Sequence, residues 1–386
     1  MRDPDRADIE AWAASGCMAL TGRSNAAPLG PPAGLVDSVR RLGISITERS
    51  GVELDTLALL AERAAISGFT RNGDQSCGAG TRLLHAVDGW VAVTLVRPDD
   101  LDAVPAWLES KADGDLWEQV ADAVATRRVE TLVERARLLA LPVAALAQST
   151  APITDTATRA ERPKPIDEAL VVDLSSLWAG PLCGHVLHLA GARVVKVESV
   201  QRPDGARRGP KTFFDLLNGG KRSVALDFQD ADGVAALQKL VARADVVIEA
   251  SRPRALEQLG VHPGASQVWV SITAYGRASD GVGFGDDTAV AGGLVVWDDA
   301  GPCFCVDAVA DPLTGLVAAE RCLAALRTGK TGVIDVPLAV VAAGFAGPTL
   351  TVGRTAGVEV APPRARTPTH AAPDLGADNE AVLKGL

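Results

Sequence analysis

The feature that most constrains the fold is a regular alternation of short apolar segments and helical segments after residue 169. Ala169–Leu174 and Arg193–Val197 are rich in valine, and the helical stretch Gly184–Ala190 lies between them. Parallel strands need a long crossover, usually a helix, so this order indicates a βαβ unit. The alternation continues through Ser223–Leu226, Asp230–Ala242, Asp245–Glu249 and Gln267–Thr273. We therefore predict an α/β protein built on a Rossmann-like, doubly wound parallel sheet.

The first 150 residues follow a different pattern. A hairpin is expected within Arg82–Leu95, because two apolar runs flank Asp88-Gly89. Helical patterns follow near 99–109, 115–126 and 128–140. We predict that residues 1–150 form N-terminal helices and a second, smaller α+β domain. Residues 151–165 should be a linker, and residues 166–386 the Rossmann-like domain with a C-terminal tail.

Charge and hydropathy narrow the classes of function. The net charge is −10 and no long basic run occurs, so neither nucleic acid nor an acidic membrane surface is an expected partner. No uncharged apolar run reaches the roughly 18 residues that a membrane-spanning helix requires. We expect a cytoplasmic protein that acts on small molecules.

The six cysteines, at positions 17, 77, 183, 303, 305 and 322, are too scattered for a disulfide framework in a chain of 386 residues. Cys303 and Cys305 could offer two thiolates to a metal ion. No second Cys or His pair lies nearby, and alternation in an extended segment explains the spacing more simply. We therefore predict no metal site.

The first turn of the predicted sheet decides between nucleotide cofactors. Glu198 ends the second strand, where an acid could hold a ribose, but Ala179–Gly184 lacks the G-x-G-x-x-G that lets backbone approach a pyrophosphate. No phosphate-binding loop of the G-x-x-x-x-G-K-[ST] type occurs either. Both observations argue against an NAD enzyme and a nucleoside triphosphatase.

Several motifs in a fixed order resemble the family III CoA-transferases, a group that includes formyl-CoA transferase, carnitine CoA-transferase and α-methylacyl-CoA racemase. The resemblance covers about residues 169–336. It rests on Val172-Asp173-Leu174, Ala179-Gly180-Pro181, Gly191–Glu198, Asn218–Asp227, Ala244–Glu249, Ala310-Asp311 and Thr314-Gly315.

The resemblance implies a catalytic role for Asp311. In the family, the aspartate at this position attacks the thioester of an acyl-CoA, and CoA is passed to a carboxylic acid through mixed anhydrides and an aspartyl-CoA thioester. Coenzyme A or acyl-CoA is then a substrate, and no permanently bound cofactor is implied. The structural alternative is that Asp311, followed by Pro312, caps the apolar helix Leu313–Leu326.

The resemblance also implies contacts with CoA. The residues Ser176, Leu177, Trp178 and Leu226 match positions that line the adenosine and pantetheine path. Lys221, Arg222 and Arg252 belong to basic motifs suited to the phosphates. Gly78 and Gly80 resemble a glycine loop that covers the reacting anhydride. Packing for Trp178, a solvated basic loop and an ordinary turn at Gly78 are the alternatives.

Departures from the family pattern keep two other functions open. Ala250 and Gln258 replace residues of the family's CoA-binding motifs, which favours a non-catalytic acyl-CoA-binding protein as the alternative. A racemase is less favoured, because no histidine occurs between His262 and His370 to pair with Asp311. The small-domain motifs precede the linker, so we predict a permuted domain order, and the resemblance implies a homodimer.

Overall fold

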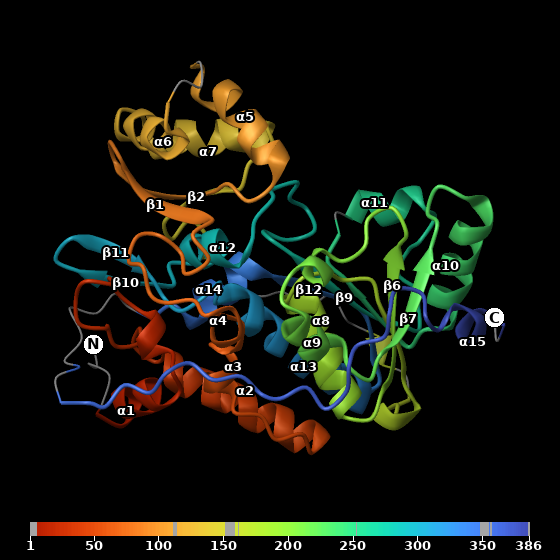
Figure 1. Ribbon diagram of the computed structural model, residues 1–386. Coiled ribbons are helices and arrows are strands. Elements are labelled where there is room, and N and C mark those ends of the chain that lie inside the picture. Colours follow the sequence, from red (N-terminus) through yellow and green to blue (C-terminus); the bar gives the residue numbers. More distant parts are fainter. Residues whose placement is uncertain are drawn as a thin grey trace.

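The computed structural model describes residues 6–110, 114–150, 159–160, 162–251, 253–347, 355 and 357–384. Its centre is a seven-stranded sheet with the order β4-β12-β9-β8-β5-β6-β7, in which β4 pairs antiparallel with β12 and the other six strands are parallel (Figure 1). The strands are β4 (Arg159–Ala160), β5 (Leu170–Asp173), β6 (Arg193–Ser199), β7 (Arg222–Leu226), β8 (Val246–Glu249), β9 (Val268–Thr273) and β12 (Lys330–Pro337).

This strand order confirms the prediction of a doubly wound sheet. From β5 at the centre, β6 and β7 follow in chain order toward one edge of the sheet. The later strands β8, β9 and β12 follow in chain order toward the other edge, which is the Rossmann arrangement. Val171 packs with helices α8 (Ala179–Leu189) and α13 (Ala310–Thr328), whereas Val172 packs with α10 (Ala231–Arg243) on the opposite face. Helices cover both faces of the large sheet, which explains why the sequences of its strands are nearly continuous apolar runs.

The smaller domain has its own core. It consists of the antiparallel sheet β1 (Thr81–Ala86), β2 (Gly89–Thr94) and β3 (Val143–Ala145), covered by α5 (Pro98–Leu108), α6 (Leu116–Ala125) and α7 (Val129–Leu138) (Figure 1). The expected hairpin is present: Ala86 pairs with Gly89, so Val87 and Asp88 form a two-residue turn and Gly89 begins β2.

The N-terminal helices differ from the prediction that grouped them with the smaller domain. The buried side chains of α1 (Arg6–Ala14) and α2 (Leu35–Ser50), such as Trp12 and Val39, share one hydrophobic core with α13 and the large sheet. The C-terminal segment runs along these helices, and Ala361 donates a backbone hydrogen bond to Ala13 (Figure 1). Residues 6–67 are thus part of the large domain's core.

The remaining elements connect these parts. The short strand β4 lies within the predicted linker, of which residues 151–158 and 161 are outside the described ranges.

No helix in the described ranges is long and apolar enough to cross a membrane. The other elements are α3 (Thr56–Leu59), α4 (Glu62–Ser67), α9 (Lys211–Asn218), α11 (Pro253–Gln258), α12 (Gly285–Ala291), β10 (Val295–Asp298), β11 (Gly301–Phe304), α14 (Leu338–Phe345), α15 (Asn379–Leu383), and three short 3-10 turns at Met18–Leu20, Ile166–Glu168 and Gly205–Arg208.

Candidate active site

Close packing of helices α8 and α13 brings the Ser176–Trp178 turn and Asp311 together. A Cβ atom at Gly315 of α13 would lie 2.6 Å from the carbonyl oxygen of Ala179 and 3.0 Å from the side chain of Leu182, both in α8. Glycine therefore allows the N-terminal parts of α13 and α8 to approach each other. Asp311 lies one turn before Gly315 in α13, and the Ser176–Trp178 turn immediately precedes α8.

The structure does not support the capping alternative for Asp311. Helix α13 begins at Ala310, its N-cap is Val309, and no side-chain capping hydrogen bond is made. Asp311 is instead the second helical residue, and its side chain is partly exposed. A carboxylate in the first turn still gains from the positive end of the helix dipole, without being used as a cap.

Three carboxyl groups surround one guanidinium at this place. Arg63 of α4 binds Asp307 through two hydrogen bonds, 2.8 Å from Nε and 2.6 Å from Nη2. Asp307 is fully buried, whereas Asp286 and Asp311 are partly exposed. We call Arg63, Asp286, Asp307 and Asp311 the carboxylate cluster.

The carboxylate cluster contains more acid than its single arginine can neutralise. Burial raises the pKa of Asp311 to about 7, Arg63 opposes this shift, and the charges of Asp286 and Asp307 add to it. Burial and Asp307 likewise raise the pKa of Asp286 to about 6. Both groups therefore titrate close to neutral pH, as groups that exchange protons or act as nucleophiles commonly do.

A glycine at the start of α12 supports the carboxyl group of Asp311. The backbone N–H of Gly285 lowers the pKa of this carboxyl group, and a Cβ atom at Gly285 would lie 2.4 Å from Asp311 Oδ2, so the two groups lie against each other. Any other residue would push the carboxyl group away. This N–H is also the kind of donor that stabilises charge developing on an oxygen during acyl transfer.

The N-terminal region completes the cluster. The side chain of Ser76 lowers the pKa of Asp286, and a Cβ atom at Gly78 would point toward Phe69 and lie 4.0 Å from Nη2 of Arg63. Gly78 is exposed beside the cluster, whereas Gly80 faces Val96 in the adjoining strand region. The loop that carries Gly78 thus borders the cluster from a part of the chain distant in sequence.

The residues expected to contact adenosine and pantetheine lie on one turn and one strand. Ser176 and Leu177 are exposed, and Leu177 adopts the left-handed conformation with φ 69°. Trp178 is buried, packs edge-on against Phe213, and lies under the guanidinium of Arg63, 5.2 Å from the ring centroid. Arg63 therefore links this turn to Asp311. Leu226 is buried at the end of β7.

The basic residues fall into two groups. Lys221 is buried, and its Nζ donates to Asp173 at 2.8 Å, to the carbonyl of Pro181 at 2.8 Å and to Asn218 at 3.1 Å, so all three of its donors are used. Arg222 is exposed at the start of β7. Arg252 lies outside the described residues. Lys221 thus has a structural position away from solvent, and we do not assign it to phosphate binding.

Other exposed cations lie near the Ser176–Trp178 turn. The carboxylate of Asp204 accepts a hydrogen bond from the backbone N–H of Leu177 at 2.9 Å, which holds the loop before Arg208 against this turn. Arg202 and Arg208 are exposed, whereas Arg207 is engaged by Glu198. Arg202, Arg208 and Arg222 thus face solvent, as does Lys211, which pairs with Asp215.

Sequence reasoning missed Arg63, Asp286 and Asp307 as members of the site. No local motif marks Arg63, because it lies within an ordinary helical pattern. The run Gly285-Asp286-Asp287, with two acids directly after a glycine, was a sequence signal that could have indicated Asp286. No group of three or more potential metal ligands occurs among the described residues.

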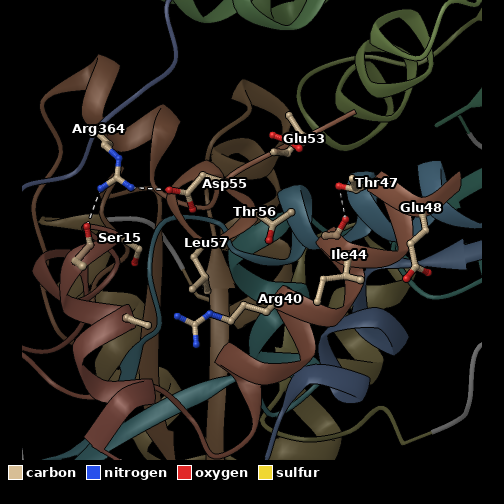
Figure 2. A pocket seen from close by; sticks show the side chains of 14 residues that line it. Ser15, Arg40, Ile44, Thr47, Glu48, Glu53, Asp55, Thr56, Leu57 and Arg364 are labelled. Carbon is tan, nitrogen blue, oxygen red and sulfur yellow. Dashed lines mark hydrogen bonds and ion pairs between the residues drawn. The ribbon is translucent and has the colours of Figure 1, made fainter. Parts of the chain in front are cut away.

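A cavity lies away from the carboxylate cluster, on the N-terminal helices. Its volume is about 620 Å³, and it is lined by residues of α1, α2 and the segment around Asp55, with Arg364 closing one side (Figure 2). Arg364 donates to Asp55 at 2.6 Å and to the carbonyl of Ala14 at 2.7 Å. None of the predicted site residues lines this cavity, so size alone does not identify the active site here.

The sequence profile of CoA-transferase family III matches residues 166–375, which is more than half of the chain. The chain belongs to CoA-transferase family III. The match contains the Ser176–Trp178 turn, Asp286, Asp307 and Asp311, whereas Arg63 and Gly78 lie before it. This confirms the family resemblance; the permuted domain order stays a prediction.

Curated relatives and solved structures match part of the chain. It is 29% identical over 199 residues to succinyl-CoA:D-citramalate CoA-transferase of Chloroflexus aurantiacus, covering 45% of this chain and 49% of the relative. It is 38% identical over 115 residues to α-methylacyl-CoA racemase of Homo sapiens, covering 30% and 27%. A crystal structure of a CaiB/BaiF family protein from Brucella suis is 32% identical, with a TM-score of 0.43, and covers 47% of this chain and 55% of that one. The chain spans about half the length of the curated relatives it matches first.

Proposed function

We propose that the protein transfers CoA from an acyl-CoA to a carboxylic acid, with Asp311 as the covalent nucleophile. The observation that carries this proposal is the position of Asp311. Its side chain is partly exposed in the first turn of α13, it lies against the backbone of Gly285, and its pKa is raised to about 7. It also lies beside Arg63, which stacks on the Trp178 turn where we expect pantetheine.

The proposed reaction alternates between anhydrides and thioesters. The Asp311 carboxylate attacks the thioester carbonyl, the C–S bond breaks, and a mixed anhydride and CoA thiolate form. The thiolate attacks the Asp311 carbonyl, which releases the first acid as carboxylate and leaves an aspartyl-CoA thioester. The acceptor carboxylate attacks this thioester to form a second anhydride, and the thiolate then attacks the acceptor's carbonyl. The new acyl-CoA leaves, and the Asp311 carboxylate is regenerated.

The cluster supplies the electrostatics of these steps. The N–H of Gly285 can stabilise negative charge that develops on the carbonyl oxygen of Asp311. Arg63 favours the ionised nucleophile, and each acylation of Asp311 removes one negative charge from a site with an excess of acid. Ser176, Leu177, Leu226 and the exposed Arg208 and Arg222 are proposed to contact CoA, together with Arg252.

The test is to trap the covalent intermediate. The protein is incubated with a short-chain acyl-CoA, treated with hydroxylamine, and digested for mass spectrometry. We expect a hydroxamate at Asp311, and reduction with borohydride instead should convert the aspartyl thioester to the corresponding alcohol. Asp311→Asn should show neither, whereas Asp102→Asn, on the exposed face of α5, should behave as the unmodified protein. An unmodified Asp311 in a protein that still binds acyl-CoA would instead establish the non-catalytic alternative.

A further inference from the structure

A cavity of about 250 Å³ lies in the seam between the two domains, apart from the carboxylate cluster. Helix α7 and the end of β3 form one side of it, and the loop that follows β9 forms the other. Its polar lining consists of Arg137, Gln148, Ser149, Tyr275 and Ser279. We call this space the seam cavity.

The seam cavity is lined by hydrogen-bond donors that lack acceptors. The hydroxyl oxygen of Tyr275 is buried and has no hydrogen-bond partner among the described residues. Burial holds the pKa of this phenol well above its usual value, so the hydroxyl keeps its proton. A buried hydroxyl without a partner is costly, which indicates that an acceptor belongs there.

The neighbouring polar groups point to the same chemistry. Arg137 forms no ion pair with a residue of the described ranges. The negative charge of Asp287 raises the pKa of the Tyr275 hydroxyl, and the positive charge of Arg137 opposes this with a smaller effect. Gln148 uses its side-chain oxygen to accept from the N–H of Ala145 at 3.0 Å, so its amide N–H₂ can donate. The Ser279 oxygen accepts from Gly281, which likewise leaves its O–H as a donor.

The rest of the lining defines the size and nature of the ligand. Val133, Leu141, Val143 and Val282 supply apolar surface, and no Asp or Glu side chain lines the cavity within the described part of the chain. A guanidinium with hydroxyl and amide donors suits a carboxylate. At about 30 Å³ for each water-sized group, the volume accepts about eight non-hydrogen atoms.

The loop that lines the seam cavity leads directly to Asp311. Gly281 and Val282 line the cavity, and the next residues approach two acids. A Cβ atom at Gly283 would lie 2.8 Å from Asp287 Oδ2, and one at Gly285 would lie 2.4 Å from Asp311 Oδ2. Phe284 between them is extended, so both positions face the same side, about 7 Å apart along the chain.

We propose that the seam cavity binds the distal carboxylate of a short dicarboxylic acid, through Arg137 and the Tyr275 hydroxyl, while the other carboxylate reacts at Asp311. The substrate role rests on the proposed function; the binding of a carboxylate does not. Arg137 and Tyr275 are then specificity residues for the acid, and the bound acid bridges the seam between the two domains.

Tyr275 provides a direct test, because it is the only tyrosine in the chain. Incorporation of 3-fluorotyrosine gives one ¹⁹F signal, which is followed while glutarate is added. We expect a saturable shift with glutarate and none with the neutral 1,5-pentanediol. Arg137→Gln should weaken binding at least tenfold, whereas Arg128→Gln, an exposed arginine just before α7, should not. No saturable shift, or equal affinity in Arg137→Gln, would overturn the proposed carboxylate site.

Turnover separates this proposal from the proposed function. With Asp311→Asn the glutarate shift should persist although no acyl transfer occurs, so failure of catalysis does not affect the binding test. With the catalytic aspartate in place, Arg137→Gln should raise the KM for glutarate about tenfold, with kcat and the KM for acyl-CoA unchanged. The KM for the monocarboxylate pentanoate should stay the same. An equal rise in KM for both acids would contradict recognition of a distal carboxylate.

Discussion

Two charged clusters lie close to the first turn of α8, and they are built in opposite ways. In one, Lys221 is paired with Asp173 at 2.8 Å and Lys196 with Asp204 at 2.8 Å, so two cations meet two anions. Ser175 donates its backbone N–H to Asp173 and accepts from Lys196 through its carbonyl. We call these four charged residues the paired cluster. In the carboxylate cluster, one arginine faces three acids.

The difference teaches which cluster supports the fold and which supports chemistry. Burial alone would raise the pKa of Asp173, but Lys221 and Lys196 lower it below its usual value. Burial and neighbouring acids raise the pKa of Asp311 to about 7. The paired cluster shapes the turn before α8. The carboxylate cluster holds the proposed nucleophile near its titration point, at a cost in stability.

The largest expected effect concerns the nucleophile. Asp311→Asn should reduce acyl transfer by about 10⁴-fold or more, because the amide cannot form the anhydride. Initial rates of CoA transfer between an acyl-CoA and a free acid measure this effect. Asp102→Asn serves as the control. A loss of less than tenfold would mean that the reaction does not pass through Asp311.

The next effect concerns the paired cluster. Lys221→Met should lower the free energy of unfolding by about 3–5 kcal/mol, because Asp173 would be left as a buried charge without its partner. Urea denaturation followed by circular dichroism gives the value. The matched control is Lys239→Met, an exposed lysine of α10, with an expected change within about 0.5 kcal/mol. Similar values for both variants would show that the pairing is not structural.

A smaller effect of opposite sign is expected in the carboxylate cluster. The folded-state pKa of Asp311 is raised above the unfolded value of 3.8, so its contribution to stability is full below about pH 4 and is lost as the pH rises through 7. Asp311→Asn should therefore stabilise the protein by about 1–3 kcal/mol at pH 8 and by less at pH 5. Thermal unfolding at both pH values tests this. If Asp311→Asn is less stable than the unmodified protein at pH 8, the carboxylate cluster does not carry an excess of negative charge.

The smallest effect is a change in pH dependence. Transfer by the unmodified protein should rise with pH around a midpoint near 7, as Asp311 loses its proton. Asp286→Asn removes a negative neighbour, makes that ionisation easier, and should lower the midpoint by about half to one pH unit. A pH profile of kcat/KM provides the measurement. If the midpoint stays in place or moves upward, Asp286 does not act on the nucleophile.

The parts of the fold that could be predicted are those that depend on residues close together in the sequence. The strands from Leu170 to Thr273 and the hairpin at Asp88-Gly89 follow from apolar runs and turn residues, and the structure has them. The two-residue strand β4 in the predicted linker and the placement of α1 and α2 on the large domain could not be predicted, since both depend on partners distant in sequence.

The same division holds for the site. The motif around Asp311 predicts the nucleophile, and this role stays a proposal; the family match includes the residue. Arg63 stands more than 200 positions away and becomes part of the site only because α4 packs beside the loop that carries Asp307. Lys221, with the same charge as a phosphate-binding residue, is instead enclosed by Asp173, Pro181 and Asn218. The homodimer stays a prediction.

The sequence by itself determined the α/β class, the family and the aspartate at the start of α13, because each depends on periodicity or on residues adjacent in the chain. The tertiary structure alone decided which charges are paired, which are left in excess, and which domain seam is lined with donors. Charge pairing and burial are properties of distances in space, and a one-dimensional pattern contains no information on those distances until the chain has folded.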